Sequence, residues 1–286
     1  MREFVIMTDS DTEIPYTFAE AHQVPVFLMP YTINGEESLF DLGKTTDYAG
    51  FYHSLREGAN ASTSTRSTYE IQCFYEDILK TGKDILYVCF SSQLSAHHDL
   101  AQMARKAALE NYPEARIEIV DSLGIAMGAG LLVYHAVRLK EEGKTMEEIM
   151  QWLLENRMRS LHFFSVDSLN YLKKTGRVSA VTATLGTMLD LKPILTLTKE
   201  GKIVAFDKVK GKKKVVKYLA DLAEKNYVED DICKELMVVC HGDNLAQAQA
   251  LKEAITQKLE FKEVWLMDVG PVIGSHVGPG MIAVVF

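Results

Sequence analysis

Short apolar runs alternate with longer amphipathic segments through the first half of the chain. An apolar run that ends in polar turn residues predicts a strand, and apolar residues that recur with a helical period predict a helix. Strands are therefore expected at 4–10, 84–90 and 116–122, with a further apolar run at 25–33, and helices at 45–58, 67–80, from 96 onward, 124–143 and 145–158. Because strands joined by helical crossovers run parallel, we expect a mostly parallel sheet here.

Two of these helices carry a start signal in the sequence. Ser67 is followed by Glu70, and Thr145 is followed by Glu148, which is the spacing of a capping box. In a capping box each of the two side chains accepts a hydrogen bond from the backbone N–H of the other residue. A helix is thus predicted to begin directly after each hydroxyl residue.

The second half of the chain has a different order of elements. Strand-like runs occur at 162–166, 193–198, 202–209, 235–241, 263–269 and 281–286, and helical patterns occur near 212–225 and 244–259. A Glu-Gly turn joins two successive strand-like runs, without an intervening helix. We therefore expect an α/β protein of two lobes: an N-terminal α/β lobe at 1–158 with a mostly parallel sheet, and a C-terminal α/β lobe at 159–286 with a mixed or antiparallel sheet.

Composition and charge argue against several classes of protein. The chain has 286 residues, 47% of them hydrophobic, and a formal net charge of −8. A nucleic-acid-binding surface needs clustered lysine and arginine, which this acidic balance does not favour. No apolar run approaches the roughly 20 residues that span a bilayer, and the N-terminus lacks an apolar signal segment. We expect a cytoplasmic protein with no nucleic-acid partner and no stable membrane insertion.

The cysteines show neither CxxC spacing nor another metal-binding pattern. At this chain length a disulfide scaffold is not expected. Cys73, Cys89, Cys233 and Cys240 are therefore predicted to be reduced, buried thiols. The sequence indicates no bound metal.

Two hydroxyl-rich loops are the most informative local feature. The stretch TSTRS contains Thr63 and Ser64, and the stretch SSQLS contains Ser91, Ser92 and Ser95. Each stretch leads into a predicted helix, whose free N–H groups and positive dipole end favour an anion. In open α/β sheets, ligands bind outside the carboxyl ends of the strands. These hydroxyls would suit a carboxylate or phosphate there; alternatively, the serines only cap their helices.

Further candidates lie in the second half of the chain. The stretch GPVIGSHVGPG (270–280) places His276 in a segment that glycine and proline are expected to shape into a rigid loop. His276 would bind an anion there, or would make one backbone contact as a neutral ring. Arg177 follows a glycine in a basic turn and suits bidentate anion contact, with a solvated turn as the alternative. The lysine-rich stretch 208–217 is either a solvated turn and helix start or a patch for an acidic or phosphate-bearing partner.

Four other polar residues lie near predicted strand or helix ends. Asp9 and Asp121 each precede a serine at the end of a predicted strand. They are expected mainly to accept hydrogen bonds from loop N–H groups, with a carboxylate pair as the alternative. His97 and His98 are expected at the exposed start of a helix. The signatures of a P-loop, a dinucleotide-binding loop, a nucleophile elbow and an HExxH metalloprotease are absent from the sequence.

Together these stretches resemble one family. TDSDTEIP, TSTRS, SSQLS, VDSLGIAMGAGLLV, YLKKTGRVS, LKPIL, GKIVAFDKVKGKKK and GPVIGSHVGPG occur in the order and spacing of the DegV family, over almost the whole chain. DegV proteins are bacterial fatty-acid-binding proteins with two α/β lobes, and the better-studied members present their fatty acid to a fatty acid kinase. The resemblance implies a non-enzymatic carrier without a cofactor, whose ligand is a long-chain fatty acid.

The resemblance also implies a role for each candidate residue. The residues that would hold the carboxyl group carry hydroxyls: Thr63, Ser64 and one or more of Ser91, Ser92 and Ser95. His276 matches the family's glycine-flanked histidine, which would complete this network. Arg177 matches an arginine beside the site or on the partner surface. The acyl chain is expected in the N-terminal lobe, with the C-terminal lobe closing the head-group site.

The sequence departs from the family pattern in four places. Arg66 stands where a proline is usual, Ala96-His97 replaces Gly-Thr, Thr175 replaces a glycine and Lys210 replaces an arginine. The first two changes lie at the expected mouth of the head-group site. The lysine weakens bidentate anion recognition, because an ammonium group is a point charge.

Two other functions stay open from the sequence. One is a hydrolase or phosphotransferase acting on a small anion, with Ser95 as nucleophile, His276 as base and Asp9 or Asp121 orienting the base. The missing nucleophile elbow counts against this enzyme. The other is a sensor or docking protein whose bound lipid controls its partner, with the basic stretch 208–217 as the partner surface.

Overall fold

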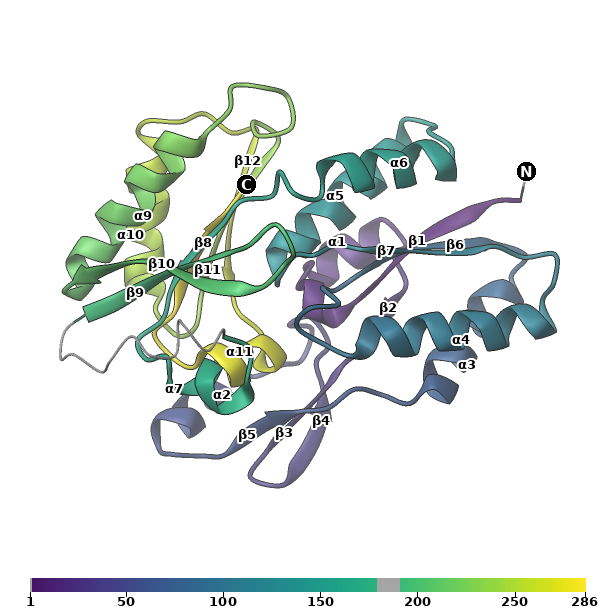
Figure 1. Ribbon diagram of the computed structural model, residues 1–286, viewed down its shortest axis with the longest axis horizontal. Helices are drawn as coiled ribbons and strands as arrows, with labels where there is room; N and C mark the ends of the chain where they lie inside the picture. The colour runs from purple at the N-terminus through teal and green to yellow at the C-terminus, as the bar shows by residue number, and fades with distance from the viewer. Residues whose placement is uncertain (1, 179–190) are drawn as a thin grey trace. The chain divides into compact units, whose positions relative to one another are not determined.

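The computed structural model of the protein describes residues 2–178 and 191–286 (Figure 1). The chain forms two compact units. Unit 1 comprises Met1–Tyr31, Glu37–Thr46 and Thr63–Ser160. Unit 2 comprises Thr32–Glu36, Asp47–Ser62 and Leu161–Phe286. Two short segments of the first half therefore belong to unit 2, which the pattern of the sequence does not indicate.

Unit 1 is built on a four-stranded sheet with the order β2-β1-β6-β7. Its strands are β1 (Phe4–Asp9), β2 (Val26–Phe27), β6 (Asp84–Cys89) and β7 (Ile117–Asp121). The neighbouring strands all run parallel, which confirms the sheet predicted from the sequence. Every residue of β6 is buried, as expected for a parallel strand that is covered on both faces.

Helices cover both faces of this sheet, as Figure 1 shows. Unit 1 contains α1 (Tyr16–Ala21), α3 (Thr68–Leu79), α4 (His97–Asn111), α5 (Met127–Glu141), α6 (Met146–Asn156) and the short 3₁₀ helix η1 (Ser10–Thr12). α3 and α4 pack on one face of the sheet, while α5 and α6 pack on the other. The strands and helices predicted for this unit are confirmed, with shifts of a few residues at their ends.

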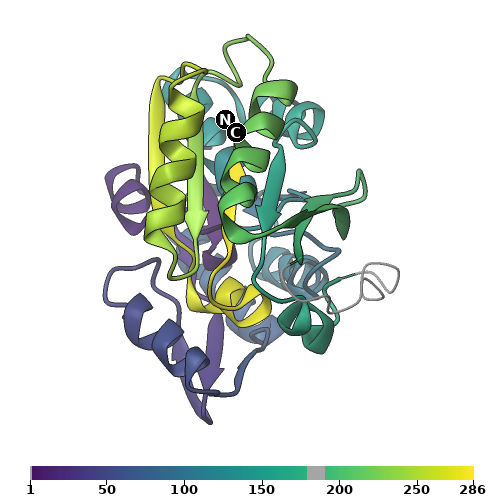
Figure 2. The same cartoon turned by 90° about the vertical axis from the view of Figure 1, so that its left-hand side faces the viewer.

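Unit 2 contains a six-stranded sheet with the order β10-β9-β8-β13-β11-β12. Its strands are β8 (His162–Ser165), β9 (Leu191–Leu197), β10 (Ile203–Lys210), β11 (Leu236–His241), β12 (Glu263–Asp268) and β13 (Ile282–Val285). β11 and β12 are parallel and the other pairs are antiparallel, which confirms a mixed sheet. Helices α9 (Lys212–Asn226) and α10 (Leu245–Thr256) pack together on one face of it (Figure 2).

Unit 2 also contains the shorter helices α2 (Tyr48–Arg56), α7 (Asn170–Thr175) and α11 (Pro271–Val277). α11 contacts both α2 and α7. None of the helices within the described residues is long and apolar enough to cross a membrane. A small sheet with the order β4-β3-β5 is formed by β3 (Pro30–Ile33), β4 (Glu36–Leu39) and β5 (Ala61–Thr63).

Two expectations about loops are wrong. The segment 270–280, expected to form a rigid loop, contains α11, because Pro271 presets the backbone at the first turn and Gly278 ends the helix. The segment 61–67, expected to be a polar loop throughout, begins with β5, because β3 supplies its hydrogen-bond partners.

Both predicted capping boxes are confirmed. The Ser67 hydroxyl accepts a hydrogen bond from the Glu70 N–H at 3.3 Å, and the Glu70 carboxylate accepts one from the Ser67 N–H at 2.9 Å. Thr145 and Glu148 repeat this arrangement at the start of α6. The hydrogen bonds from Ser67, with a further one from Arg66, lower the pKa of the Glu70 carboxyl to about 2.

Replacing Glu70 by glutamine is expected to lower the free energy of unfolding at pH 7 by about 0.5–1 kcal/mol, because solvent screens this partly exposed carboxylate. The contribution of the carboxylate is present above its unfolded pKa near 4.5 and is lost as the pH falls toward about 2. Urea unfolding at pH 7 and pH 3 measures the difference. Glu110→Gln, at an exposed position of α4, is the control. A difference that does not shrink at pH 3 would contradict the assignment.

Candidate functional site

The hydroxyl-rich loop 91–95 follows the carboxyl end of β6 and leads into α4. The Ser91 hydroxyl accepts a hydrogen bond from the Gln93 N–H at 3.2 Å, and the Ser95 hydroxyl accepts one from the His97 N–H at 3.2 Å. Within the described residues, no side chain or carbonyl accepts the hydroxyl proton of Ser95. This proton therefore remains available to a ligand or to solvent.

The second hydroxyl-rich loop begins at the end of β5. Thr63 is half-buried and Ser64 is exposed. Arg66 donates hydrogen bonds to Glu70 at 2.9 and 3.0 Å, and its guanidinium lies 4.7 Å from the centroid of the Phe27 ring. Arg66 is thus held by an ion pair and an aromatic ring.

Carboxylates at the ends of β1 and β7 brace the loop that follows β6. Asp121 accepts hydrogen bonds from the Ser92 N–H at 3.1 Å and from the Ser92 hydroxyl at 2.6 Å. Asp9 accepts them from the Asp11 N–H at 3.1 Å and from the Phe90 N–H at 3.0 Å. The loop-bracing role predicted for Asp9 and Asp121 is confirmed, and the Ser92 hydroxyl is engaged with Asp121.

A buried chain of polar groups links Asp9 to His97 through Tyr87. The Tyr87 hydroxyl donates to the Asp9 carboxylate at 2.7 Å and lies 2.7 Å from His97 Nε2. The expectation that His97 is exposed is wrong: it is 1% exposed, because its ring stacks on Phe27 inside unit 1. His98 is half-buried. Burial lowers the pKa of His97, so its ring is neutral at pH 7.

Among the described residues, Asp9, Cys89 and His97 could hold a metal ion, since one ligand atom of each lies within 4.8 Å of the others. The Tyr87 hydroxyl forms hydrogen bonds with Asp9 and His97 Nε2 and interacts with Cys89. These hydrogen bonds occupy the atoms that a metal would need, so the arrangement fits a polar core cluster better.

All the cysteines are free thiols, and Cys73 is half-buried instead of buried.

Arg177 and His276 lie in unit 2. Arg177 follows Gly176, whose left-handed backbone ends α7, and its guanidinium donates to the Thr175 carbonyl at 2.5 Å. His276 is half-buried near the end of α11. Burial, with a smaller effect of the Arg177 charge, lowers the pKa of His276 to about 4. The ring is therefore neutral at pH 7 and can serve as a hydrogen-bond donor or acceptor.

Glycines beside His276 permit two close approaches. A Cβ atom on Gly274 would lie 2.8 Å from Phe51 Cε1, and one on Gly278 would lie 2.4 Å from the Tyr171 ring. Gly278 also has a φ of 72°, in the left-handed region that favours glycine. The helices α2 and α7 therefore pack directly against the segment that carries His276.

Replacing Arg177 by glutamine is expected to raise the pKa of His276 above about 4 but not to 6.5, because the dominant cause, burial, remains. NMR titration of the His276 ring measures this, with Lys173→Gln on α7 as the control. In the parent, the neutral ring stabilises the fold above the unfolded pKa of 6.5, and this contribution is lost as the pH falls toward about 4. A parent midpoint near 6.5 would contradict the assignment.

The lysine-rich stretch 208–217 covers the end of β10 and the start of α9. Lys212 pairs with Asp167 at 2.6 Å, and Lys217 pairs with Asp221 at 2.5 Å. The remaining lysines are exposed: Lys208, Lys210, Lys213 and Lys214. Because a helix dipole disfavours cations at its first turn, Lys213 and Lys214 do not serve to stabilise α9. Both a solvated surface and a partner surface stay consistent with this arrangement.

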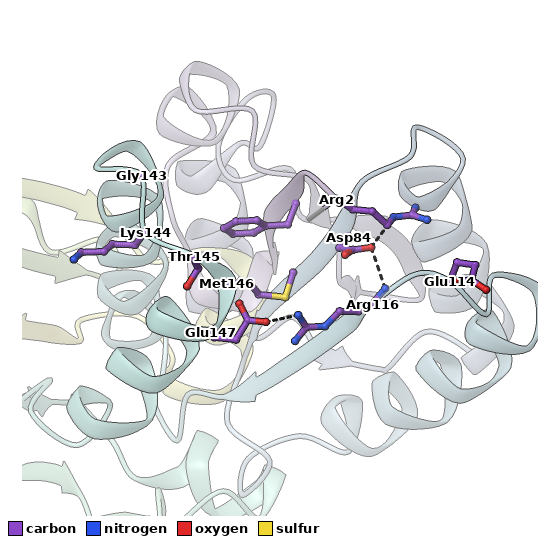
Figure 3. A pocket seen from close by; sticks show the side chains of 10 residues that line it. Arg2, Asp84, Glu114, Arg116, Gly143, Lys144, Thr145, Met146 and Glu147 are labelled. Carbon is purple, nitrogen blue, oxygen red and sulfur yellow. Dashed lines mark hydrogen bonds and ion pairs between the residues drawn. The ribbon is translucent and has the colours of Figure 1, made fainter.

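A surface cavity of about 380 Å³ lies in unit 1, next to the first residues of β1 and β6. Figure 3 shows the side chains that line it. It lies at the end of the sheet opposite the hydroxyl-rich loop 91–95. Four of its charged side chains form ion pairs with one another, since Arg2 pairs with Asp84 at 3.0 Å and Arg116 pairs with Glu147. No residue predicted for the ligand site lines it, so this cavity is not the candidate site.

The predicted ligand residues are divided between the two units. Unit 1 holds those that carry hydroxyls: Thr63, Ser64, Ser91, Ser92 and Ser95. Unit 2 holds Arg177 and His276. Each set lies within its own unit, and the single site that would join them stays a prediction. The polar chain through Tyr87 and His97 was not predicted from the sequence. Tyr87 lies on a buried strand and His97 begins a helix, and no sequence motif links two such positions.

Known proteins match this chain over its full length. A family model described as "Uncharacterised protein, DegV family" matches residues 3–286. A DegV domain-containing protein of Clostridium perfringens is 36% identical over 286 residues, covering 100% of this chain and 98% of that protein. One from Streptococcus pyogenes serotype M1 is 32% identical over 283 residues, covering 98% and 96%. The structure of a DegV family protein from Thermus thermophilus, described by its fatty acid binding, has a TM-score of 0.88 at 27% identity, covering 100% of this chain and 99% of that one.

Proposed function

The chain belongs to the DegV family, and from this premise we propose that it is a cytoplasmic carrier that binds a long-chain fatty acid. The observation that carries the proposal is the fold shared over the full length with the Thermus thermophilus protein, whose structure is described by fatty acid binding. Each buried CH₂ group of an acyl chain contributes about 0.8 kcal/mol, so a long chain supplies ample affinity.

In this proposal the carboxyl group is held by hydroxyls of the two loops in unit 1, with Thr63 and Ser95 as the principal donors. The position of loop 91–95 at the carboxyl end of β6 supports this, because open α/β sheets bind ligands there. The available hydroxyl proton of Ser95 supports it as well. The neutral ring of His276 and the Arg177 guanidinium would tune the polar mouth.

Native mass spectrometry of the purified protein, followed by solvent extraction, tests the proposal. The expected result is a stoichiometric long-chain fatty acid that leaves on extraction and can be loaded again. A clean apo mass, with no uptake of added fatty acids between 14 and 18 carbons, would overturn the proposal.

We further propose that the carrier presents its fatty acid to a fatty acid kinase. The exposed lysines Lys208, Lys210 and Lys213 would steer an acidic partner surface toward unit 2. With a bacterial fatty acid kinase and ATP, the loaded protein is expected to yield an acyl phosphate, trapped with hydroxylamine. No product, from a kinase preparation that acts on another DegV carrier, would contradict presentation to that kinase.

We propose that the protein itself is not an enzyme. Asp9 and Asp121, the residues that would orient a base in the hydrolase alternative, are engaged with loop donors in unit 1, which supports a bracing role. A turnover screen with acyl and phosphate esters is expected to release no product. Sustained turnover that disappears in Ser95→Ala would instead favour the hydrolase.

A further inference from the structure

One ring nitrogen of His97 is engaged and the other is not. Nε2 lies 2.7 Å from the Tyr87 hydroxyl, whereas Nδ1 is buried and has no hydrogen-bond partner among the residues that the structure describes. The residue as a whole is 1% exposed. A buried polar atom without a partner is unfavourable, and most such atoms in proteins are paired.

The hydrogen bond from the Tyr87 hydroxyl to Asp9 determines which ring nitrogen of His97 carries the proton. The Asp9 carboxylate accepts hydrogen bonds from the Asp11 N–H, the Phe90 N–H and the Tyr87 hydroxyl. Because Tyr87 has a single hydroxyl proton and donates it to Asp9, its oxygen can only accept from His97. Nε2 therefore carries the proton and Nδ1 presents a lone pair. The two nitrogens face in diverging directions, so this lone pair points away from Tyr87.

The backbone of His97 adjoins the loop that would hold the carboxyl group, and its ring packs on Phe27. The His97 N–H donates to the Ser95 hydroxyl at 3.2 Å. The His97 ring stacks on Phe27 with centroids 5.5 Å apart, and Phe74 packs edge-on against Phe27. The open lone pair thus lies in aromatic surroundings within two residues of Ser95. A purely apolar acyl chain would leave it unpaired.

We propose that this protein selects fatty acids that carry a hydroxyl group near the carboxyl end, with the hydroxyl donating to His97 Nδ1. The inference rests on the proposed function, because it takes the carboxyl group to be held at Ser95. In this inference a carboxyl group bound at Ser95 directs the first carbons of the chain toward the His97 ring, and a 3-hydroxyl is the group that pairs with Nδ1. A site built around a hydroxyl group discriminates against the analogue that lacks it, since its own polar atom is then left unpaired.

Isothermal titration calorimetry of the delipidated protein tests this with hexadecanoic, 3-hydroxyhexadecanoic and 12-hydroxyoctadecanoic acids. The 3-hydroxy acid is expected to bind about 10-fold more tightly than the unsubstituted acid, as for one buried hydrogen bond. The 12-hydroxy acid is expected to show no such gain. In His97→Phe, which keeps an aromatic ring on Phe27 but removes the acceptor, the 3-hydroxy and unsubstituted acids are expected to bind equally. His98→Phe is the matched control and is expected to keep the preference.

Each other outcome has a distinct meaning. If hexadecanoic and 3-hydroxyhexadecanoic acids bind equally to the parent, the inference is wrong, Nδ1 is satisfied by water, and the proposed function stands. If neither acid binds, the proposed function itself fails.

Should His97→Phe not fold, ¹⁵N NMR of the histidine rings in the parent replaces it. The 3-hydroxy acid is expected to shift the resonance of His97 Nδ1, and hexadecanoic acid is expected to leave it unchanged. Equal shifts with both acids would overturn the inference.

Discussion

Replacing Asp9 by alanine is expected to lower the free energy of unfolding by about 3–5 kcal/mol. The Asp9 carboxylate is fully buried and accepts hydrogen bonds from the Asp11 N–H, the Phe90 N–H and the Tyr87 hydroxyl. Alanine would leave these donors buried without a partner. Urea unfolding monitored by circular dichroism measures the loss.

An exposed carboxylate supplies the control for this substitution. Asp99 lies in the first turn of α4 with 88% of its side chain exposed, so Asp99→Ala is expected to change stability by less than about 0.5 kcal/mol. Asp9→Asn keeps one carbonyl acceptor and is expected to fall between the two. A loss below about 1 kcal/mol in Asp9→Ala would show that the donors find other partners, which contradicts the bracing role.

Combining Thr63→Val with Ser95→Ala is expected to weaken fatty acid binding by at least about 100-fold, because hydrogen bonds to a charged group contribute about 1.5–3 kcal/mol each. Valine keeps the shape of threonine, and alanine at position 95 removes one accepted hydrogen bond, from the His97 N–H, so the fold is expected to remain intact. Calorimetric titration with hexadecanoic acid and native mass spectrometry measure affinity and occupancy.

Ser92 provides a matched comparison within the same loop. Its hydroxyl donates to Asp121 at 2.6 Å, so Ser92→Ala is expected to lower stability while changing fatty acid affinity less than about 3-fold. Unchanged affinity in the double variant would place the carboxyl group away from Thr63 and Ser95. A large loss of affinity in Ser92→Ala alone would instead show that Ser92 is a principal donor.

Patterns among residues close in the sequence were sufficient to predict most of the helices and strands. The apolar run of β6 predicts a buried parallel strand, and the Ser67–Glu70 spacing predicts the start of α3. The role of Asp9 and Asp121 as acceptors for loop N–H groups was also predicted from the sequence, because a carboxylate at a strand end meets the N–H groups of loops at the same edge of the sheet. The order of the motifs along the chain was sufficient to identify the family, since it needs no contact between distant residues.

Only the tertiary structure decided which distant segments meet. The segments 32–36 and 47–62 join unit 2 although they lie in the first half of the chain. His97 is buried because Phe27, far earlier in the sequence, stacks on its ring. The glycine-rich segment 270–280 forms α11, packed against α2 and α7. The physical reason is that periodicity and capping report local backbone preferences, whereas burial and the choice of hydrogen-bond partners depend on contacts between residues far apart in sequence.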